Sequence, residues 1–335
     1  MKSAYIQETG DPGVIQYGEL PKPVPQAGEV LIRVGAVSVN PIDIYIRSGM
    51  VSMPLRFPYT VGCDVAGTIE VKGRGVRRFN EGDRVWGSNQ GLFGRQGTTS
   101  EYVVVDEKWL YPTPPTQSDI EAAAGALVGI TAYLGLFRFA HVQQGDILFV
   151  NGGAGGVGAA VIQQAKAAGA KVIATVGNAQ KAVYCQQLGA DLVIDYHAPD
   201  LDDQIRAFSA SNGGVNVWFE TQREPTLDRT IAMMAPRGRI VVIAGRQSQP
   251  QFTLGAFYTK DLAILGYAMF NASPDEQREC AVALNNLYVR GGWHPAVGVT
   301  FPMSQTALAH QLQQANTLDK QGTLAGKIVI VPDPA

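Results

Sequence analysis

The pattern of hydrophobic and polar positions changes about a third of the way along the chain. Before the change, short runs rich in β-branched and aromatic residues are separated by Gly, Pro and Asp turns, at 29–39, 65–73, 82–87 and 100–107. Short strands at this spacing are typical of a barrel-like fold. From Ala122 to Ala140 the chain is an apolar run rich in small residues and too long for a strand. It predicts a buried helix near a domain boundary.

Strands and helices alternate in the segment that follows. We expect strands at 147–150, 171–176, 191–194, 215–220, 238–245 and 262–267, and helices at 156–168, 179–188, 201–210 and 225–234. Because these strands are apolar without interruption, they indicate a parallel sheet covered on both faces. The remainder predicts helices at 275–290 and 304–316 and strands at 297–301 and 327–332. A return to the first domain is the economical arrangement for this last part.

The length of the chain also favours two domains, because 335 residues exceed the size at which one hydrophobic core stops growing. We place the first domain at 1–123 and 271–335 and the second at 124–270.

A glycine-rich turn joins the first of the alternating strands to its helix. It contains Gly153, Gly155 and Gly158 in a G-x-G-x-x-G spacing, directly after an apolar strand. In this context glycine allows a tight turn, a close approach of a pyrophosphate and close packing of helix on strand. The amides at the helix start would then face the phosphates. The alternative is a turn that serves packing alone.

The end of the second strand of this unit bears on which dinucleotide is bound. An NAD site carries Asp or Glu about 20 residues after the glycine turn, where it holds the ribose 2′-hydroxyl. Residues 174–182 contain no carboxylate, and Gly177, Asn178 and Lys181 suit a 2′-phosphate instead. Tyr196, after the third strand, offers a hydroxyl to the same group. The pattern therefore favours NADPH, with Lys181 on a solvated helix face as the alternative.

Composition excludes several other classes of protein. Hydrophobic residues make up 46% and charged residues 17%, which is an ordinary globular balance. A net charge of -2 without a basic cluster argues against nucleic acid or an anionic membrane as a partner. The N-terminal segment lacks the apolar core of a signal peptide, and we expect no stretch of about 18 apolar residues able to span a bilayer. A cytoplasmic protein is expected.

The cysteines and histidines do not predict a metal site. Cys63, Cys185 and Cys280 form no C-x-x-C pair, and the four histidines show no i, i+4 pair. We therefore expect no metal.

Several motifs together resemble one known family. They are NPIDIYIRSG (40–49), PYTVGCDVAGTIE (58–70), GDRVWG (82–87), the glycine turn and GRIVVIAG (238–245). These segments look like the medium-chain dehydrogenase/reductase family, in the quinone oxidoreductase branch that includes zeta-crystallin. The resemblance implies an α/β protein with a GroES-like β-barrel-type catalytic domain and a Rossmann domain with a doubly wound parallel sheet. It also implies that Asn40 and Cys63 stand where zinc-containing members have cysteine and histidine ligands.

The resemblance further implies roles for particular residues. Tyr45 and Asn40 would be catalytic and lie beside the nicotinamide, and Thr131 would lie near its ribose. The pyrophosphate would be held by Ala154, Gly155, Gly156 and Val157, and the nicotinamide side would be lined by Gly245, Arg246, Tyr267, Ala268 and Met269. Other interpretations stay open: Tyr45 and Thr131 as packing residues, and Asn40 as a turn or cap residue.

The function implied is the NADPH-dependent reduction of a quinone or conjugated carbonyl without a metal. Alternatives are an enone, alkenal or enoyl-thioester reductase and, from another class, an RNA-binding or structural crystallin-like protein. The strand at 262–267 is the last of its sheet and predicts a homo-oligomer, a dimer or a tetramer. Two departures from the family bear on the substrate: a long loop at 88–99 and Glu220 in place of an aspartate. The sequence leaves open the physiological substrate, the role of this loop and the choice between one-electron and hydride transfer.

Overall fold

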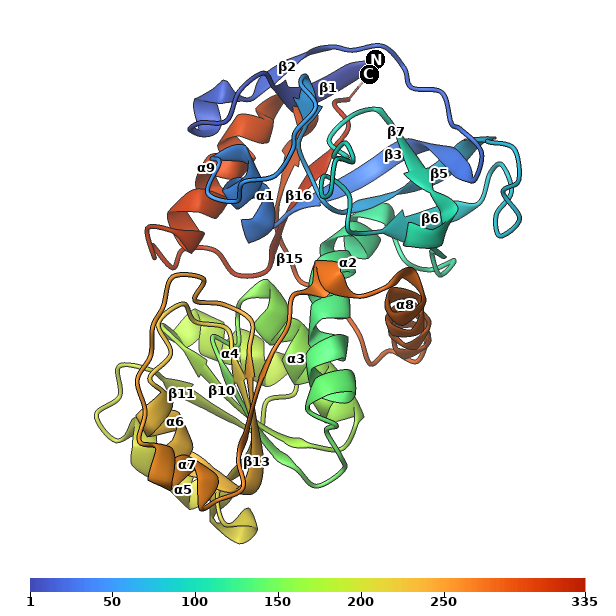
Figure 1. The fold of residues 1–335 in the computed structure, drawn as a ribbon. Coiled ribbons are helices and arrows are strands. Elements are labelled where there is room, and N and C mark those ends of the chain that lie inside the picture. Colours follow the sequence, from blue (N-terminus) through green and yellow to red (C-terminus); the bar gives the residue numbers. More distant parts are fainter. Residues whose placement is uncertain (335) are drawn as a thin grey trace. The chain divides into compact units, whose positions relative to one another are not determined.

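The chain folds into two compact units. The structure is a computed structural model that describes residues 1–334. The first unit comprises Met1–Leu127, Ser273–Val289 and the chain from His294 onward, and the second comprises Val128–Ala272 and Arg290–Trp293 (Figure 1). The division after Leu127 falls inside a helix.

The first unit contains two sheets. A three-stranded sheet has the order β2 (Gln16–Glu19), β1 (Lys2–Ile6) and β4 (Tyr59–Thr60). A seven-stranded sheet has the order β15 (Val297–Pro302), β16 (Lys327–Val331), β3 (Glu29–Val39), β5 (Val65–Lys72), β6 (Arg84–Gly87) and β8 (Leu110–Pro112), with β7 (Tyr102–Asp106) also paired to β3. The last two strands of the chain thus join the sheet built by its first third.

Strand β3 organises the first unit because it pairs with β5, β7 and β16, and its register with β5 shifts twice. Such irregularities bend a strand and let one sheet curve around its own core. Apolar residues of four strands, such as Ile32, Val65, Val103 and Ile328, form that core. The β-rich first unit that the sequence predicted is present.

Helices of the first unit are α1 (Pro41–Arg47), α8 (Pro274–Val289) and α9 (Thr306–Thr317). Short 3-10 turns lie at η1 (Pro12–Val14), η2 (Glu107–Trp109) and η6 (Met303–Gln305). Helix α9 packs on α1, which follows β3 directly and is too short to be stable without such tertiary contacts.

The second unit is a six-stranded parallel sheet with the order β11 (Leu192–Asp195), β10 (Lys171–Val176), β9 (Ile147–Asn151), β12 (Val215–Glu220), β13 (Met234–Val242) and β14 (Ala263–Gly266). Its helices are α3 (Gly156–Ala167), α4 (Ala179–Gln187), α5 (Leu201–Ser209), α6 (Leu227–Met233) and α7 (Leu254–Tyr258), with 3-10 turns η4 (Ala210–Asn212) and η5 (Met269–Asn271). Along the chain, the strands run from β9 in the middle of the sheet out to β11 at one edge, and then from β12 out to β14 at the other edge. This is the Rossmann order. The predicted parallel sheet is confirmed.

Some elements differ from the sequence prediction. Strand β13 runs from Met234 to Val242, so Gly245 lies in the loop after it. The short helix α7 and the strands β1 and β2 were not predicted. The predicted helix at 122–140 is α2 (Asp119–Tyr133) followed by a π-helical turn, Leu134–Phe139.

The expectation that no segment has the length and apolarity of a membrane span was wrong for one segment. Asp119–Phe139 has 21 residues and a mean hydropathy of 1.6, because apolar residues fill this run and charged ones occur only near its ends. However, 72% of that window is buried in the protein, as in the core helix of a globular fold. One such helix is weak support for a span.

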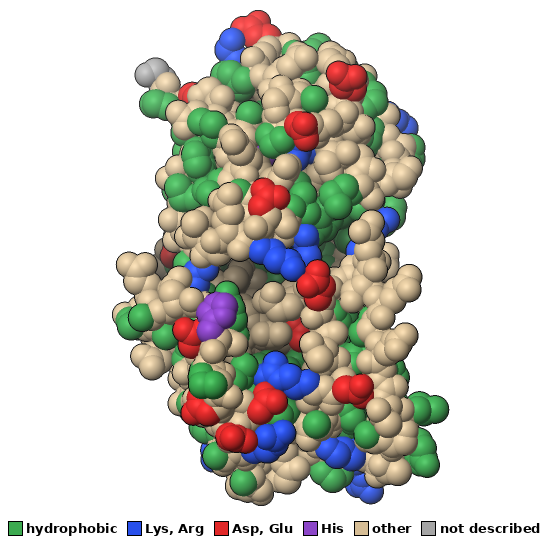
Figure 2. Space-filling model, turned by 90° about the vertical axis from the view of Figure 1, so that its left-hand side faces the viewer, with side chains coloured by type: hydrophobic (Ala, Val, Ile, Leu, Met, Phe, Trp, Pro, Cys, Tyr) green, Lys and Arg blue, Asp and Glu red, His purple; other side chains and the backbone are tan. Residues whose placement is uncertain are grey.

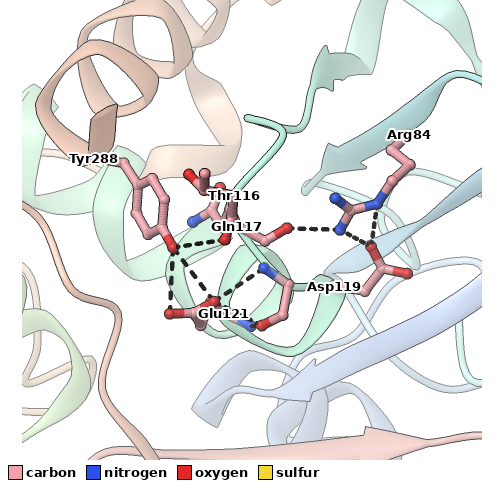
Figure 3. Close-up of polar contacts among 7 residues, drawn as sticks. Arg84, Thr116, Gln117, Asp119, Glu121 and Tyr288 are labelled. Carbon is pink, nitrogen blue, oxygen red and sulfur yellow. Dashed lines mark hydrogen bonds and ion pairs between the residues drawn. The ribbon is translucent and has the colours of Figure 1, made fainter. Parts of the chain in front are cut away.

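Helix α2 is anchored where it starts in the first unit (Figure 3). Arg84 forms an ion pair of 2.6 Å with Asp119, and its guanidinium also donates to the carbonyl of Gln117. The Tyr288 hydroxyl from α8 points at Glu121 and donates to its carboxylate at 3.4 Å. The first turn of α2 is therefore held by both β6 and α8.

The charged side chains of the surface are mixed in sign. On the face drawn in Figure 2, Lys and Arg side chains lie among Asp and Glu side chains. No continuous basic stripe crosses this face, which agrees with the net charge of -2.

Candidate active site

The predicted cofactor-binding residues of the second unit lie at one edge of its sheet. The glycine turn follows β9, Gly177 follows β10 and Tyr196 follows β11. Gly245 and Arg246 follow β13, and Tyr267 follows β14. Because all six strands are parallel, these positions share the carboxyl edge of the sheet, where ligands of this fold bind.

The glycine turn has the shape of a phosphate cradle. A Cβ on Gly153 would lie 2.8 Å from Ala174 Cβ, and one on Gly158 would lie 2.2 Å from the Gly152 carbonyl oxygen. At Gly155 the nearest such atom is 3.4 Å away, so this side of the turn is open. Gly155 is also the N-cap of α3 and offers no side-chain acceptor to the first amides of the helix. The turn can therefore bring a pyrophosphate close to those amides.

The structure refines the expected role of one glycine. The residue with left-handed backbone geometry is Gly152, with φ of 81°, which lies just before the G-x-G-x-x-G motif. Gly153 instead gives room for close packing on β10.

A buried polar network holds the turn on the sheet. The Asn151 amide donates to the Glu220 carboxylate at 3.1 Å, and Thr175 donates to the Asn151 side-chain oxygen at 2.7 Å. The amide N–H of Gly152 donates to the Thr175 hydroxyl at 3.1 Å. Burial raises the pKa of Glu220, and hydrogen bonds from Gln222, Trp218 and Asn151 oppose that rise. The network ties the start of the turn to β10 and β12.

At the end of β10, Gly177 gives space to Tyr196. A Cβ on Gly177 would lie 2.5 Å from the Tyr196 hydroxyl oxygen, so that hydroxyl lies directly over the strand end. Lys181 lies in the first turn of α4, and its amide N–H donates to the Asn178 side chain at 2.9 Å. Desolvation lowers the pKa of Lys181. The structure thus brings Gly177, Tyr196 and Lys181 to one corner of the unit.

On the other half of the same edge, Tyr267 is fixed by two contacts. Its hydroxyl donates to the Thr131 carbonyl, and its ring stacks on Phe139 with centroids 4.7 Å apart. Thr131 and Met269 are buried, whereas Arg246 is exposed. Gly245 has φ of 88°, and a Cβ there would lie 2.7 Å from the Arg223 carbonyl oxygen.

In the first unit, Asn40 caps helix α1. Its amide N–H donates to the Asp43 carboxylate at 2.7 Å, and the Asp43 amide donates to the Asn40 carbonyl at 3.0 Å. Asn40 is fully buried, whereas Tyr45, one turn further along α1, is half-buried. Of these two predicted catalytic side chains, the Tyr45 phenol is the more accessible.

The Asn40 side chain belongs to a buried charged cluster. Its amide donates to Asp64 Oδ2 at 2.8 Å and to the Ser38 carbonyl at 3.3 Å. Its side-chain oxygen accepts from Lys327 Nζ at 2.6 Å. Burial raises the pKa of Asp43 to about 7 and raises that of Asp64, while burial lowers the pKa of Lys327. The attraction between Lys327 and the carboxyl groups of Asp43 and Asp64 offsets part of each pKa shift.

This cluster does not fit a catalytic zinc ion, which takes three protein ligands. Within residues 1–334, no three His, Cys, Asp or Glu side chains come together in a way that could hold a metal. Burial keeps the pKa of the Cys63 thiol well above its usual value, which opposes the thiolate a metal needs. Lys327 Nζ already lies in this cluster, where it donates to Asn40 Oδ1 at 2.6 Å. Among residues 1–334, this cluster therefore offers no ligand set for a catalytic zinc ion.

The loop at 88–99 is packed against its neighbours in the first unit. Tyr59 donates to the Gly91 carbonyl at 2.8 Å, and the amide N–H of Thr60 donates to Gln96 at 2.8 Å. The Arg95 guanidinium donates to the Asn89 carbonyl at 2.6 Å, and Leu92 is buried. The loop therefore has a defined shape against residues 56–60.

Sequence reasoning missed two groups of site residues. Asn151 ends β9 directly before the glycine turn, and Thr175 lies in β10, so a polar residue in each of two apolar strands was the available signal. Lys327 and Asp43 gave no comparable signal, since a lysine before an apolar strand ordinarily extends into solvent.

The protein combines a β-rich unit with a Rossmann unit that carries an open glycine turn. This combination is typical of two-domain proteins that bind a dinucleotide. Residues 26–115 match the alcohol dehydrogenase GroES-like domain, and residues 156–286 match the zinc-binding dehydrogenase domain. A quinone oxidoreductase of Rattus norvegicus is 33% identical over 316 residues, covering 93% of this chain and 93% of the relative.

Solved structures agree with this assignment. An Escherichia coli quinone oxidoreductase complexed with NADPH has a TM-score of 0.85 and 27% identity, covering 99% of this chain and 100% of its own. An NAD-dependent alcohol dehydrogenase has a TM-score of 0.89 and 29% identity with the same coverage. The chain belongs to the medium-chain dehydrogenase/reductase family, in its quinone oxidoreductase branch.

Proposed function

We propose that the protein is an NADPH-dependent oxidoreductase that reduces a quinone or a similar conjugated carbonyl compound without a metal. The observation that carries the proposal is the corner formed by Gly177, Lys181 and Tyr196 beside an open glycine turn. The quinone oxidoreductase relatives support the acceptor class.

The cofactor would be held mainly by residues at the carboxyl edge of the six-stranded sheet. Ala154, Gly155, Gly156 and Val157 would bind the pyrophosphate, with Gly153 and Gly158 shaping the turn. Thr131 would lie near the ribose, and the nicotinamide side would be lined by Gly245, Arg246, Tyr267, Ala268 and Met269. When bound, the nicotinamide supplies the reducing equivalents as a hydride.

Preference for NADPH follows from the end of β10. The two structural neighbours name different dinucleotides, NADPH in one and NAD in the other. In this chain residues 174–182 contain no carboxylate that would bind a ribose 2′-hydroxyl or repel a 2′-phosphate. Lys181 offers the charge and Tyr196 the hydroxyl for the phosphate.

Tyr45 would contact the acceptor in the first unit, where its phenol orients the carbonyl group and donates a hydrogen bond as negative charge develops on oxygen. Asn40 would act beside it at the start of α1. Because both hydrogens of the Asn40 amide are engaged by Asp64 and Ser38, we assign it the task of holding α1.

The acceptor class separates this proposal from its main alternative, an enone, alkenal or enoyl-thioester reductase. The experiment is NADPH oxidation by the purified protein with 1,4-benzoquinone, a small alkenal and a crotonyl thioester in parallel. We expect the highest kcat/KM for the quinone. A higher value for the alkenal or the thioester would favour the alternative, and no oxidation with any acceptor would contradict an oxidoreductase function.

The assembly and location belong to the same proposal. We place the catalytic domain at 1–123 and 271–335 and the cofactor domain at 124–270. A cytoplasmic homo-oligomer, a dimer or tetramer, would form through β14, which is an edge strand of its sheet with Ile264 36% exposed. RNA binding is disfavoured by the net charge of -2, and the face drawn in Figure 2 carries charges of both signs.

A further inference from the structure

The strongest unexplained feature of the first unit is the buried ammonium of Lys327. This residue is only 5% exposed and begins β16, whose next residue, Ile328, pairs with Val39 at the end of β3. Its Nζ donates to the Val39 carbonyl at 2.5 Å and to Asn40 Oδ1 at 2.6 Å. A buried lysine is costly, so it is retained only where its bonds do something that an apolar residue cannot do.

The bonds of Lys327 determine how the Asn40 amide points. The ammonium only donates, so it faces the amide oxygen, while Asp64 only accepts when ionised and faces the amide nitrogen. A flipped amide would place its N–H groups against the ammonium and its oxygen against the carboxylate. Lys327 and Asp64 therefore permit a single orientation of Asn40.

That orientation bears on the start of helix α1. Asn40 is the N-cap of α1, and Lys327 binds the carbonyl of the preceding residue as well, so both residues at the β3–α1 corner are fixed by one side chain. Helix α1 has seven residues and carries Tyr45 in its second turn. Its direction depends on this corner, because so short a helix has little stability of its own.

We propose that Lys327 is a positioning residue for the reaction: it locks Asn40 and, through the start of α1, holds Tyr45 where the acceptor binds. The link to the acceptor rests on the proposed function, whereas the link from Lys327 to α1 does not.

The test uses Lys327→Met, which keeps an unbranched side chain of similar length and removes the charge. Its matched control is Lys260→Met, because Lys260 also donates to main-chain carbonyls, those of Ile231 and Met234, but lies in the second unit. Hydrogen exchange of the peptide covering 40–49 is measured on the full-length proteins. We expect Lys327→Met to speed exchange of the α1 amides about tenfold, and Lys260→Met to leave it unchanged. Unchanged exchange in Lys327→Met would overturn the proposal.

A double-mutant cycle with Tyr45→Phe tests the link to the reaction. If Lys327 acts through Tyr45, Lys327→Met should lower kcat about tenfold in the wild type and less than twofold in Tyr45→Phe, with the NADPH Kd unchanged in both. Equal losses in both backgrounds would overturn this link. Asn40→Ala serves as a second variant if Lys327→Met does not fold, and it should show the same exchange and coupling. A wild type inactive with quinones would contradict the proposed function, while the exchange result would still decide the role of Lys327 at α1.

Discussion

At the end of β10, the residues Gly177, Lys181 and Tyr196 are those to which we assign the choice of dinucleotide. Gly177 leaves space for the Tyr196 hydroxyl, and Lys181 lies in the first turn of α4. The glycine is needed there because any side chain would displace the tyrosine. The sequence already indicated Lys181 as a cation of this corner.

Replacing Lys181 by alanine should reduce the preference for NADPH over NADH. One lost charge-assisted bond to a phosphate is worth roughly 1.5–3 kcal/mol, which corresponds to about a ten- to hundredfold change in the ratio of kcat/KM values. Lys171→Ala is the control, since Lys171 is exposed at the opposite end of β10. An unchanged ratio in Lys181→Ala would show that Lys181 does not bind the 2′-phosphate.

Tyr45 is the half-buried residue of α1 to which we assign contact with the acceptor. Tyr45→Phe removes the hydroxyl and leaves the ring, so the fold should be retained. A lost neutral hydrogen bond is worth about 0.5–1.5 kcal/mol, and we expect kcat/KM for the quinone to fall about two- to twelvefold with an unchanged Kd for NADPH. Tyr258→Phe, at a 64% exposed position, should have no effect. An unchanged kcat/KM for the quinone in Tyr45→Phe would show that the phenol has no role in the reaction.

Among the helices, α9 supports α1 through a hydrogen bond between their buried faces. Arg47 of α1 donates to the Gly10 carbonyl at 2.6 Å and to Gln314 of α9. His310 of α9 is 1% exposed, and burial together with the charge of Arg47 lowers its pKa to about 3. The imidazole is therefore neutral in the folded protein at neutral pH.

This histidine should make the first unit sensitive to acid. Between pH 6.5 and about 3 the unfolded chain binds a proton at His310 that the folded chain does not, so stability falls as the pH is lowered through this window. His310→Gln removes this titration and should flatten the fall of the unfolding midpoint between pH 7 and pH 4.5. His197→Gln, at an exposed position, is the control. Equal slopes in His310→Gln and the wild type would contradict the assignment.

Strand β14 is the element on which the proposed dimer depends. It pairs with β13 on one side and forms an edge of the six-stranded sheet. In a two-fold assembly Ile264 would lie near its symmetry mate, so Ile264→Lys would bring like charges together and should yield monomers. Val282→Lys, at an exposed position of α8, should leave the mass of the assembly measured by light scattering unchanged. Light scattering that finds a wild-type monomer at micromolar concentration would contradict the proposal.

For the whole molecule, the second unit was more predictable than the first. Its strands are apolar throughout because both faces of a parallel sheet are covered, and such runs are visible in a sequence. Strands β1 and β2 are short and partly exposed, and their pairing depends on distant residues. The Lys327–Asn40 contact joins residues 287 positions apart, so no local pattern announces it. The π-helical turn after α2 likewise continues an apolar helical pattern without a mark in the sequence.

The claim that most needs testing is that the protein reduces quinones with NADPH and without a metal. The direct measurement is the steady-state rate of NADPH oxidation with 1,4-benzoquinone, before and after exhaustive treatment with a chelator, with zinc content determined on the same samples. We expect substoichiometric zinc and the same quinone-dependent rate in both samples. Stoichiometric zinc together with loss of the rate after chelation would contradict it.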